Sequence, residues 1–247
     1  MTATIEPVTL DAVAAALGLG DHELVSLVGG GGKTTLLFTL GRQLGRRTVL
    51  TTTTKMGRDQ TGGYPVLTAP DDDAVAAALD RTGPVLVRRR EVDTKARGVA
   101  PETCDRWFNE VPGIDHVIVE ADGSRQRPFK APREGEPVIP SRTTTLVACV
   151  GAGAIGRVIA DACHRPLRLA AVAGCSPYER LTADRLATVL ASDRGSRKGC
   201  PPAARYLALI NQVADHHLPF IDELVANVGS AFPVVAVAKA AGNAAEH

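Results

Sequence analysis

The sequence predicts an α/β fold, with a doubly wound, mostly parallel sheet that carries helices on both faces. Two observations predict this class. Apolar runs of strand length alternate with helical patterns along the 247 residues, which is the order typical of parallel sheets. A glycine-rich loop at 29–32 also joins an apolar run to a helical pattern, and such a loop belongs between a strand and a helix of an α/β sheet.

The elements are expected within a single domain over residues 1–247. A leading helix is expected within 1–20, over Val8–Leu17, and the tail 240–247 is expected to fray. Short apolar runs between polar or turn residues predict strands at 24–28, 48–50, 84–87, 116–121, 146–150, 170–172, 206–210 and 234–238. Helical spacing and start signals predict helices at 34–45, 71–79, 101–108, 182–191 and 217–228.

The segment Val25–Thr35 reads V-S-L-V-G-G-G-G-K-T-T and predicts a phosphate-binding loop. Glycine lets the backbone curl closely enough to point successive N–H groups at anionic oxygens. Lysine reaches the outer phosphates, and the following threonine offers its hydroxyl to Mg²⁺. The chain is therefore expected to have a P-loop NTPase-like fold and to contact nucleotide through Gly29, Gly30, Gly31, Gly32, Lys33, Thr34 and Thr35.

Two carboxylates end the apolar run 116–121, where open α/β sheets bind their ligands. Glu120 and Asp122 lie two residues apart, so on a strand they face the same side. With Thr34 they are expected to organise Mg²⁺, and with Lys33 they form the candidate catalytic set. Which acid lies nearer the metal stays open, and Asp-Gly-Ser at 122–124 is also good turn chemistry.

Three polar segments admit a functional and a structural interpretation. The loop 125–133 carries four cations, which either act on a triphosphate or an anionic second substrate, or are simply solvated. The threonines at 51–54 either bind phosphate, water or Mg²⁺ or reflect the strand preference of threonine. The run Arg88–Arg90 is expected to be a solvated strand end.

Weaker motifs occur in the second half of the chain. Residues 151–156 match G-x-G-x-x-G, but no acidic residue follows between 162 and 178 to bind a ribose, so NAD binding is not expected. The stretch 211–215 is similar to a guanine-reading N-K-x-D box with lysine replaced by glutamine, and Asn211 is expected to line the base pocket. Cys163 and His164 are expected to be structural.

The composition of the chain limits the expected binding partners of the protein and its expected cellular location. The 28 basic and 27 acidic residues nearly cancel, so neither nucleic acid nor an anionic membrane surface is an expected partner. The sequence contains neither an apolar run long enough to span a membrane nor a signal-peptide pattern, and its five cysteines form no C-x-x-C pair. A cytoplasmic protein with reduced thiols is expected.

Several of these motifs together resemble the YqeC family, described as selenium-dependent molybdenum hydroxylase accessory proteins. The resemblance covers nearly the whole chain and is carried by G-G-G-G-K-T-T at 29–35, the threonine run at 51–54, V-E-A-D-G-S at 119–124, and R-P-F-K-A-P after it. Further matches are E-P-V-I-P at 136–140, H-R-P at 164–166, S-D-R-G-S-R-K-G at 192–199 and L-I-N-Q-V at 209–213. One departure is Lys55, where the family is expected to have histidine.

The resemblance implies a P-loop NTPase that helps to mature a molybdenum-containing hydroxylase. The expected cofactors are Mg²⁺ and ATP, CTP or GTP, and the expected partners are a molybdenum hydroxylase or its cofactor-maturation proteins. Two other functions stay open beside hydrolysis. One is nucleotidyl or phosphoryl transfer to a molybdenum-cofactor-type precursor, and the other is a partner-dependent, nucleotide-binding chaperone with negligible turnover of its own.

Overall fold

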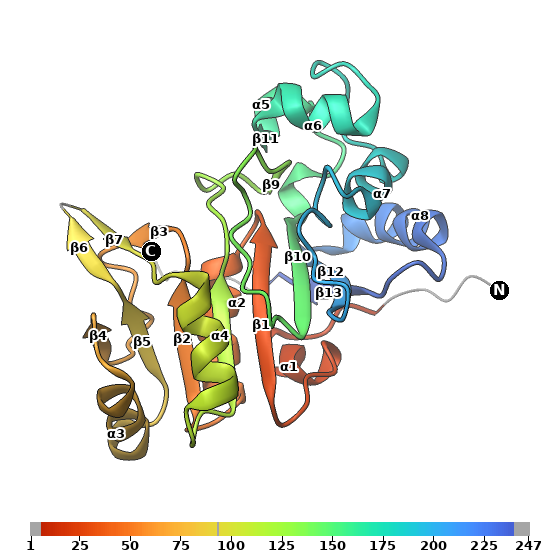
Figure 1. The fold of residues 1–247 in the computed structure, drawn as a ribbon. Helices are drawn as coiled ribbons and strands as arrows, with labels where there is room; N and C mark the ends of the chain where they lie inside the picture. Colours follow the sequence, from red (N-terminus) through yellow and green to blue (C-terminus); the bar gives the residue numbers. More distant parts are fainter. Residues whose placement is uncertain (1–5, 93, 240–247) are drawn as a thin grey trace, which may run out of the picture.

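A computed structural model describes residues 6–92 and 94–239, and an eight-stranded sheet forms its centre (Figure 1). Every neighbouring pair in this sheet runs parallel. In spatial order the strands are β13 (Val234–Ala238), β12 (Arg205–Val213), β10 (Thr145–Gly151), β1 (Glu23–Gly29), β8 (His116–Glu120), β2 (Thr48–Thr52), β5 (Val85–Arg88) and β4 (Val66–Thr68). The expected parallel α/β sheet is confirmed.

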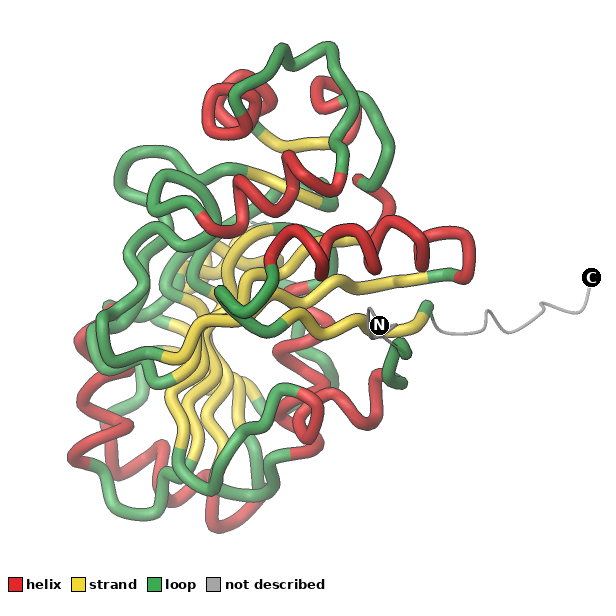
Figure 2. Tube along the Cα trace, turned by 90° about the vertical axis from the view of Figure 1, so that its right-hand side faces the viewer, coloured by secondary structure: helices red, strands yellow, loops and turns green. Residues whose placement is uncertain are grey.

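Helices cover both faces of this sheet, as the turned view shows (Figure 2). The α-helices are α1 (Val13–Ala16), α2 (Lys33–Gln43), α3 (Asp72–Thr82), α4 (Pro101–Glu110), α5 (Ile159–Ala162), α6 (Pro166–Ala173), α7 (Ala183–Ala191) and α8 (Leu218–Val228). Three short 3₁₀ turns are η1 (Leu10–Ala12), η2 (Ala152–Ala154) and η3 (Asp215–His217). Among these described elements, α1 and α2 pack on one face, while α3, α4, α7 and α8 pack on the other.

Alternation along β1 explains why a nearly continuous apolar run makes this strand. Leu24 and Val28 pack in the same cluster as Trp107 of α4. Val25 and Leu27 point the opposite way and pack in the cluster of α2. A parallel strand covered by helices on both faces needs apolar residues at every position, because successive side chains point to opposite sides.

Two smaller sheets were not predicted, because their strands are too short to give a periodic pattern. The first is antiparallel and consists of β3 (Lys55–Gly57), β7 (Lys95–Arg97) and β6 (Arg90–Val92). The second pairs β9 (Phe129–Lys130) with β11 (Cys163–His164) in parallel. Both lie beyond the carboxyl edge of the main sheet (Figure 1).

The strand expected at Ala170–Val172 is wrong, because these residues lie in helix α6. Pro166 stands in the first turn, where its missing N–H costs nothing, and Gly174 ends the helix in a left-handed conformation. The expected leading helix is shorter than predicted and is divided between η1 and α1. The tail 240–247 lies outside the described residues. No helix in the described part of the chain is long and apolar enough to cross a membrane.

Arg88 corrects the expectation of a solvated strand end at 88–90. Its side chain is buried, with 1% of the residue exposed, whereas Arg89 and Arg90 are exposed. The Arg88 guanidinium donates to the carbonyl oxygens of Arg58 at 2.8 Å and Gln60 at 2.6 Å. Arg88 therefore fixes the loop that follows β3 against the end of β5.

We predict that Arg88→Ala lowers the free energy of unfolding by about 3 kcal/mol, because it empties the buried space of the Arg88 side chain and removes its hydrogen bonds to the carbonyls of Arg58 and Gln60. Urea denaturation measures this loss. Arg81→Ala, which removes an exposed arginine of α3, is the matched control and should change stability by less than about 0.5 kcal/mol. Equal effects of the two substitutions would contradict the anchoring role.

Candidate functional site

A pocket of about 680 Å³ opens at the carboxyl edge of the central sheet, where the first turn of α2 begins. Ligands of open parallel sheets bind at this edge. Six residues predicted from the sequence line the pocket: Gly31, Gly32, Lys33, Thr34, Thr35 and Glu120. Four other predicted residues are not among its lining residues: Gly29, Gly30, Asp122 and Asn211.

The glycine loop is packed too closely for any side chain. A Cβ atom on Gly31 would lie 2.0 Å from the backbone nitrogen of Gly151, and one on Gly32 would lie 2.2 Å from the Asn211 side chain. Both glycines also have positive φ angles, 68° and 103°. Gly151 is the first glycine of the G-x-G-x-x-G match, and three residues of 3₁₀ turn follow it. Its role in this structure is close packing against the loop.

Internal acceptors already hold most of the loop amides. The Gly29 amide donates to both oxygens of Asp122 at 3.1 Å. The Gly30 amide donates to the carbonyl of Cys149 at 2.9 Å, and the Gly31 amide donates to the carbonyl of Arg127 at 3.3 Å. The first turn of α2 therefore supplies the backbone donors nearest the pocket, because the leading N–H groups of a helix have no partner within it.

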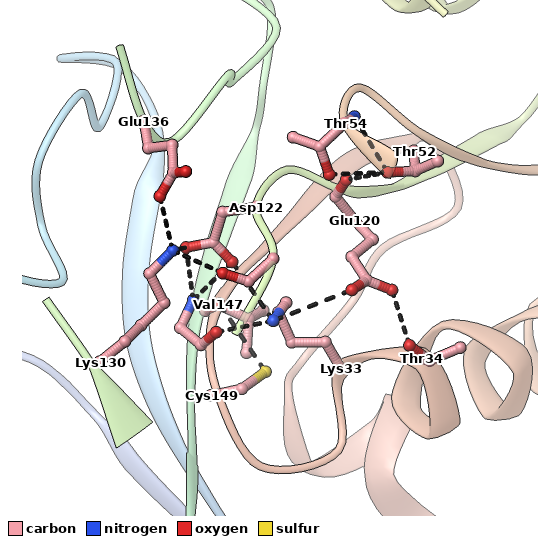
Figure 3. A network of polar contacts seen from close by, with 12 residues as sticks. Lys33, Thr34, Thr52, Thr54, Glu120, Asp122, Lys130, Glu136, Val147 and Cys149 are labelled. Carbon is pink, nitrogen blue, oxygen red and sulfur yellow. Dashed lines mark hydrogen bonds and ion pairs between the residues drawn. The ribbon is translucent and has the colours of Figure 1, made fainter. Parts of the chain in front are cut away.

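Lys33 lines the pocket, but its ammonium is turned toward acceptors within the protein (Figure 3). Its ammonium donates to the carbonyl of Gly29 at 2.6 Å and lies 3.3 Å from Asp122 and 3.8 Å from Glu120. Burial alone would lower the pKa of Lys33, but the two carboxylates outweigh it, so the pKa is raised. Lys33 is therefore a cation held by internal partners in this state.

Glu120 and Asp122 occupy different environments. Glu120 ends β8 and lines the pocket, where its carboxylate accepts the hydroxyl hydrogen of Thr34 at 2.8 Å. Burial raises the pKa of Glu120, although Lys33 opposes this. Asp122 is 1% exposed and lies behind the glycine loop. Of the two acids, Glu120 is the one that faces both the pocket and the threonine hydroxyl.

Lys130 is the buried centre of a charge network that extends away from the pocket (Figure 3). Its ammonium lies 3.1 Å from Asp122 and 2.8 Å from Glu136. Arg165 also donates to both oxygens of Glu136, at 2.7 and 3.0 Å. Burial would raise the pKa of Glu136, but the hydrogen bonds from Arg165 and Lys130 lower it to about 2.

The four cations of the loop 125–133 have separate positions. Arg125 lines the pocket, whereas Arg127 donates to the carbonyl of Asp161. Lys130 is buried, and Arg133 pairs with Glu136 at 3.0 Å. The loop is therefore neither wholly solvated nor wholly directed at one ligand.

Backbone carbonyls accept hydrogen bonds from threonine hydroxyls at the end of β2 and just after it. Thr51 donates to the carbonyl of Val87 at 2.8 Å, and Thr53 donates to that of Val138 at 2.6 Å. Thr52 donates to the carbonyl of Glu120 at 2.7 Å. Thr51 and Thr52 thereby join β2 to the ends of β5 and β8, and Thr53 joins it to the loop that contains Val138.

Asn211 supports the glycine loop at a bulge in β12. Its amide donates to the carbonyl of Gly31 at 3.2 Å, and its side-chain oxygen accepts the amide hydrogen of Gln212 at 2.9 Å. Gln212 has a positive φ of 63° and lines the pocket. The residue after the predicted asparagine therefore faces the ligand space.

Sequence reasoning missed several residues that line the pocket. Lys55 and Lys95 come from the small antiparallel sheet, and Asp59 and Gln60 come from the loop that Arg88 fixes. Lys55 had a signal, since it directly follows the threonine run. The others are scattered polar residues in a segment without periodicity. Within the described residues, no group of three or more His, Cys, Asp or Glu side chains could hold a metal ion by itself.

Comparison with known proteins gives one family and one curated relative. Residues 25–167 match the family described as YqeC protein. The chain is also 33% identical over 213 residues to a protein of Escherichia coli (strain K12) named "Uncharacterized protein YqeC", with 82% of each chain covered. No solved structure matches the chain.

We predict that Asp122→Ala lowers the free energy of unfolding by about 3–5 kcal/mol, because it leaves Lys33 and Lys130 buried with less compensating charge. Glu120→Gln should lose less than about 1 kcal/mol, since its amide oxygen still accepts from Thr34. Urea denaturation of both variants checks the difference. Equal losses would mean that Asp122 is not the centre of the buried network.

We predict a pH dependence that comes from Glu136. A carboxyl whose pKa is lowered on folding stabilises the protein above its unfolded pKa, and this contribution is lost as the pH falls through the folded pKa. Glu136→Gln should therefore be less stable than the parent at neutral pH, and the difference should shrink between about pH 4.5 and pH 2. Urea midpoints across this range measure it, and a difference independent of pH would contradict the assignment.

Proposed function

The chain belongs to the YqeC family, and we propose that it binds a nucleoside triphosphate with Mg²⁺ and hydrolyses the bond between the β- and γ-phosphates. The observation that carries this proposal is the pairing of Thr34 with Glu120 at 2.8 Å, in the pocket where α2 begins. A hydroxyl and a carboxylate at a helix N-terminus after a glycine loop are the groups that hold Mg²⁺ and phosphate in P-loop proteins.

Thr34 and Glu120 fit Mg²⁺ because both offer oxygen, the ligand type that this ion prefers. When bound, Mg²⁺ would neutralise charge on the β- and γ-phosphate oxygens. Asp122 is less suited to this role, since both of its oxygens already accept from the Gly29 amide. We therefore assign the metal to Thr34 and Glu120, and the positioning of the loop to Asp122.

The residues of the pocket supply charge and donors for the triphosphate. Lys33 would exchange its bond to the Gly29 carbonyl for the outer phosphates, which are stronger acceptors. Three more cations line the same pocket: Lys55, Lys95 and Arg125. Its acidic lining residues are Asp59 and the proposed metal ligand Glu120, so positive charge predominates. Stabilisation of charge and alignment of phosphate and water are sufficient to accelerate this reaction.

The proposal leaves open whether the nucleotide is ATP, CTP or GTP. Gln212 offers both an amide donor and an acceptor from the edge of the pocket. Such a group can bond the edge of more than one base. The role in the cytoplasm that we propose follows the resemblance drawn from the sequence, namely maturation of a molybdenum-containing hydroxylase, with the hydroxylase or its cofactor-maturation proteins as partners.

A second candidate function is a nucleotide-dependent chaperone that turns over only with its partner. The inward position of Lys33 favours it, because the lysine and three of the glycine amides are all engaged by internal acceptors. Nucleotide binding would then have to break these contacts first. Tight binding with hydrolysis only after partner addition distinguishes this function from that of a free-standing NTPase.

We predict that Thr34→Val weakens Mg²⁺-dependent triphosphate binding at least about tenfold, because the hydroxyl ligand is lost. Lys33→Ala should reduce both binding and phosphate release by a similar or larger factor. Calorimetric titration with ATP, GTP and CTP, followed by phosphate release, measures both effects. Lys239→Ala, which removes an exposed lysine outside the pocket, is the control and should behave like the parent.

Three outcomes separate the candidates. Binding with phosphate release supports the NTPase, whereas binding without turnover supports the partner-dependent chaperone. Absence of any triphosphate binding by the folded parent protein, or full activity of both pocket variants, would refute the proposed nucleotide site.

A further inference from the structure

A second pocket of about 540 Å³ adjoins the first and carries a surplus of positive charge. Four cations line it: Lys55, Arg89, Arg97 and Arg133. The carboxylate among its lining residues is Glu136, which is already paired with Lys130, Arg133 and Arg165. Lys55 and Gly123 line both pockets, so that a ligand in one would be the neighbour of a ligand in the other.

The small antiparallel sheet brings three of these cations close together, although their mutual repulsion opposes folding. Lys55 of β3 and Arg97 of β7 are direct partners across the antiparallel ladder, and the Arg89 amide donates to the Arg97 carbonyl at 3.0 Å. Like charges directly opposite each other destabilise a sheet. Among the side chains that the structure describes, no carboxylate pairs with Lys55, Arg89 or Arg97.

A helix N-terminus adds to this charge. Val99, Ala100 and Pro101 line the second pocket, and α4 begins at Pro101. Its N-cap residue, Ala100, has no side chain that could accept from the first amides. The N-terminus of a ten-residue helix carries a partial positive charge and favours an anion. The helix and the four cations therefore point to the same class of ligand.

We propose that the second pocket binds the phosphate group of a small phosphate monoester, which would be a second ligand beside the triphosphate. A dianion fits because the pocket combines a helix N-terminus with Lys55, Arg89 and Arg97, which have no carboxylate partner among the side chains that the structure describes. A phosphate also offers the oxygens that guanidinium groups bond in pairs. This inference rests on the proposed function only in taking the ligand of the first pocket to be a triphosphate. Binding of phosphate in the second pocket does not require a triphosphate in the first.

The test uses inorganic phosphate as the probe, with Mg²⁺ and a non-hydrolysable ATP analogue present in one titration and absent in a second. Arginine Nε–H resonances in ¹H–¹⁵N spectra report contact at the second pocket. We expect phosphate to shift the resonances of Arg89 and Arg97 in both titrations. Acetate at equal ionic strength should bind at least about tenfold more weakly, because it carries a single charge.

Variants separate this site from the glycine loop. Arg89→Ala combined with Arg97→Ala should weaken phosphate binding at least about tenfold, because two charge-assisted donors are lost. Both side chains are exposed, so near-native folding is expected. Arg81→Ala combined with Arg168→Ala removes two exposed arginines outside both pockets and leaves the same net charge. This control should bind phosphate like the parent.

The results distinguish failure of this inference from failure of the nucleotide site. Phosphate binding that depends on Arg89 and Arg97 supports the second site even if no triphosphate binds. Phosphate binding that is abolished by Lys33→Ala and unaffected by the arginine pair would place the anion in the glycine loop and overturn the inference. Equal losses in the arginine pair and its control, or no phosphate binding at all, would also overturn it.

Discussion

The ion pair between Asp122 and the two buried lysines, Lys33 and Lys130, is the contact on which the rest of the site depends. Asp122 accepts the amide of Gly29 and so holds the start of the glycine loop against the end of β8. It also fixes Lys130, which continues the network to Glu136. A carboxylate in this position is stable because two cations compensate for its burial. The loop, the strand end and the 129–136 segment are thereby fixed together.

The sequence predicted the central sheet well because buried parallel strands leave a strong local signal. The strands β1, β8, β10 and β12 are buried at nearly every position, and each has an apolar run at its centre, as burial on both faces requires. The error at Ala170–Val172 has the same origin, since a short apolar run without period fits a buried helix equally well. Arg88 was misjudged because burial of an arginine depends on acceptors that lie about thirty residues earlier in the chain.

The candidate site was predicted in part, and the limit is visible at Glu120 and Asp122. Residues two apart face the same side only while the strand continues. Here β8 ends at Glu120, and the chain then turns Asp122 behind the glycine loop. The spacing therefore predicted the place of both acids but not their different environments. Lys130 was unpredictable in the same way, because its partners come from two other segments.

The small antiparallel sheet, which has no clear sequence signal, explains where the cations that face ligand space come from. Met56 of β3 and Ala96 of β7 are cross-strand partners, and both are buried. Their neighbours along each strand must then point outward, because side chains alternate. Those neighbours include Lys55, Lys95 and Arg97, which line the two pockets. Since Lys33 and Lys130 are neutralised inside the protein, this sheet supplies much of the positive charge that an anionic ligand would meet.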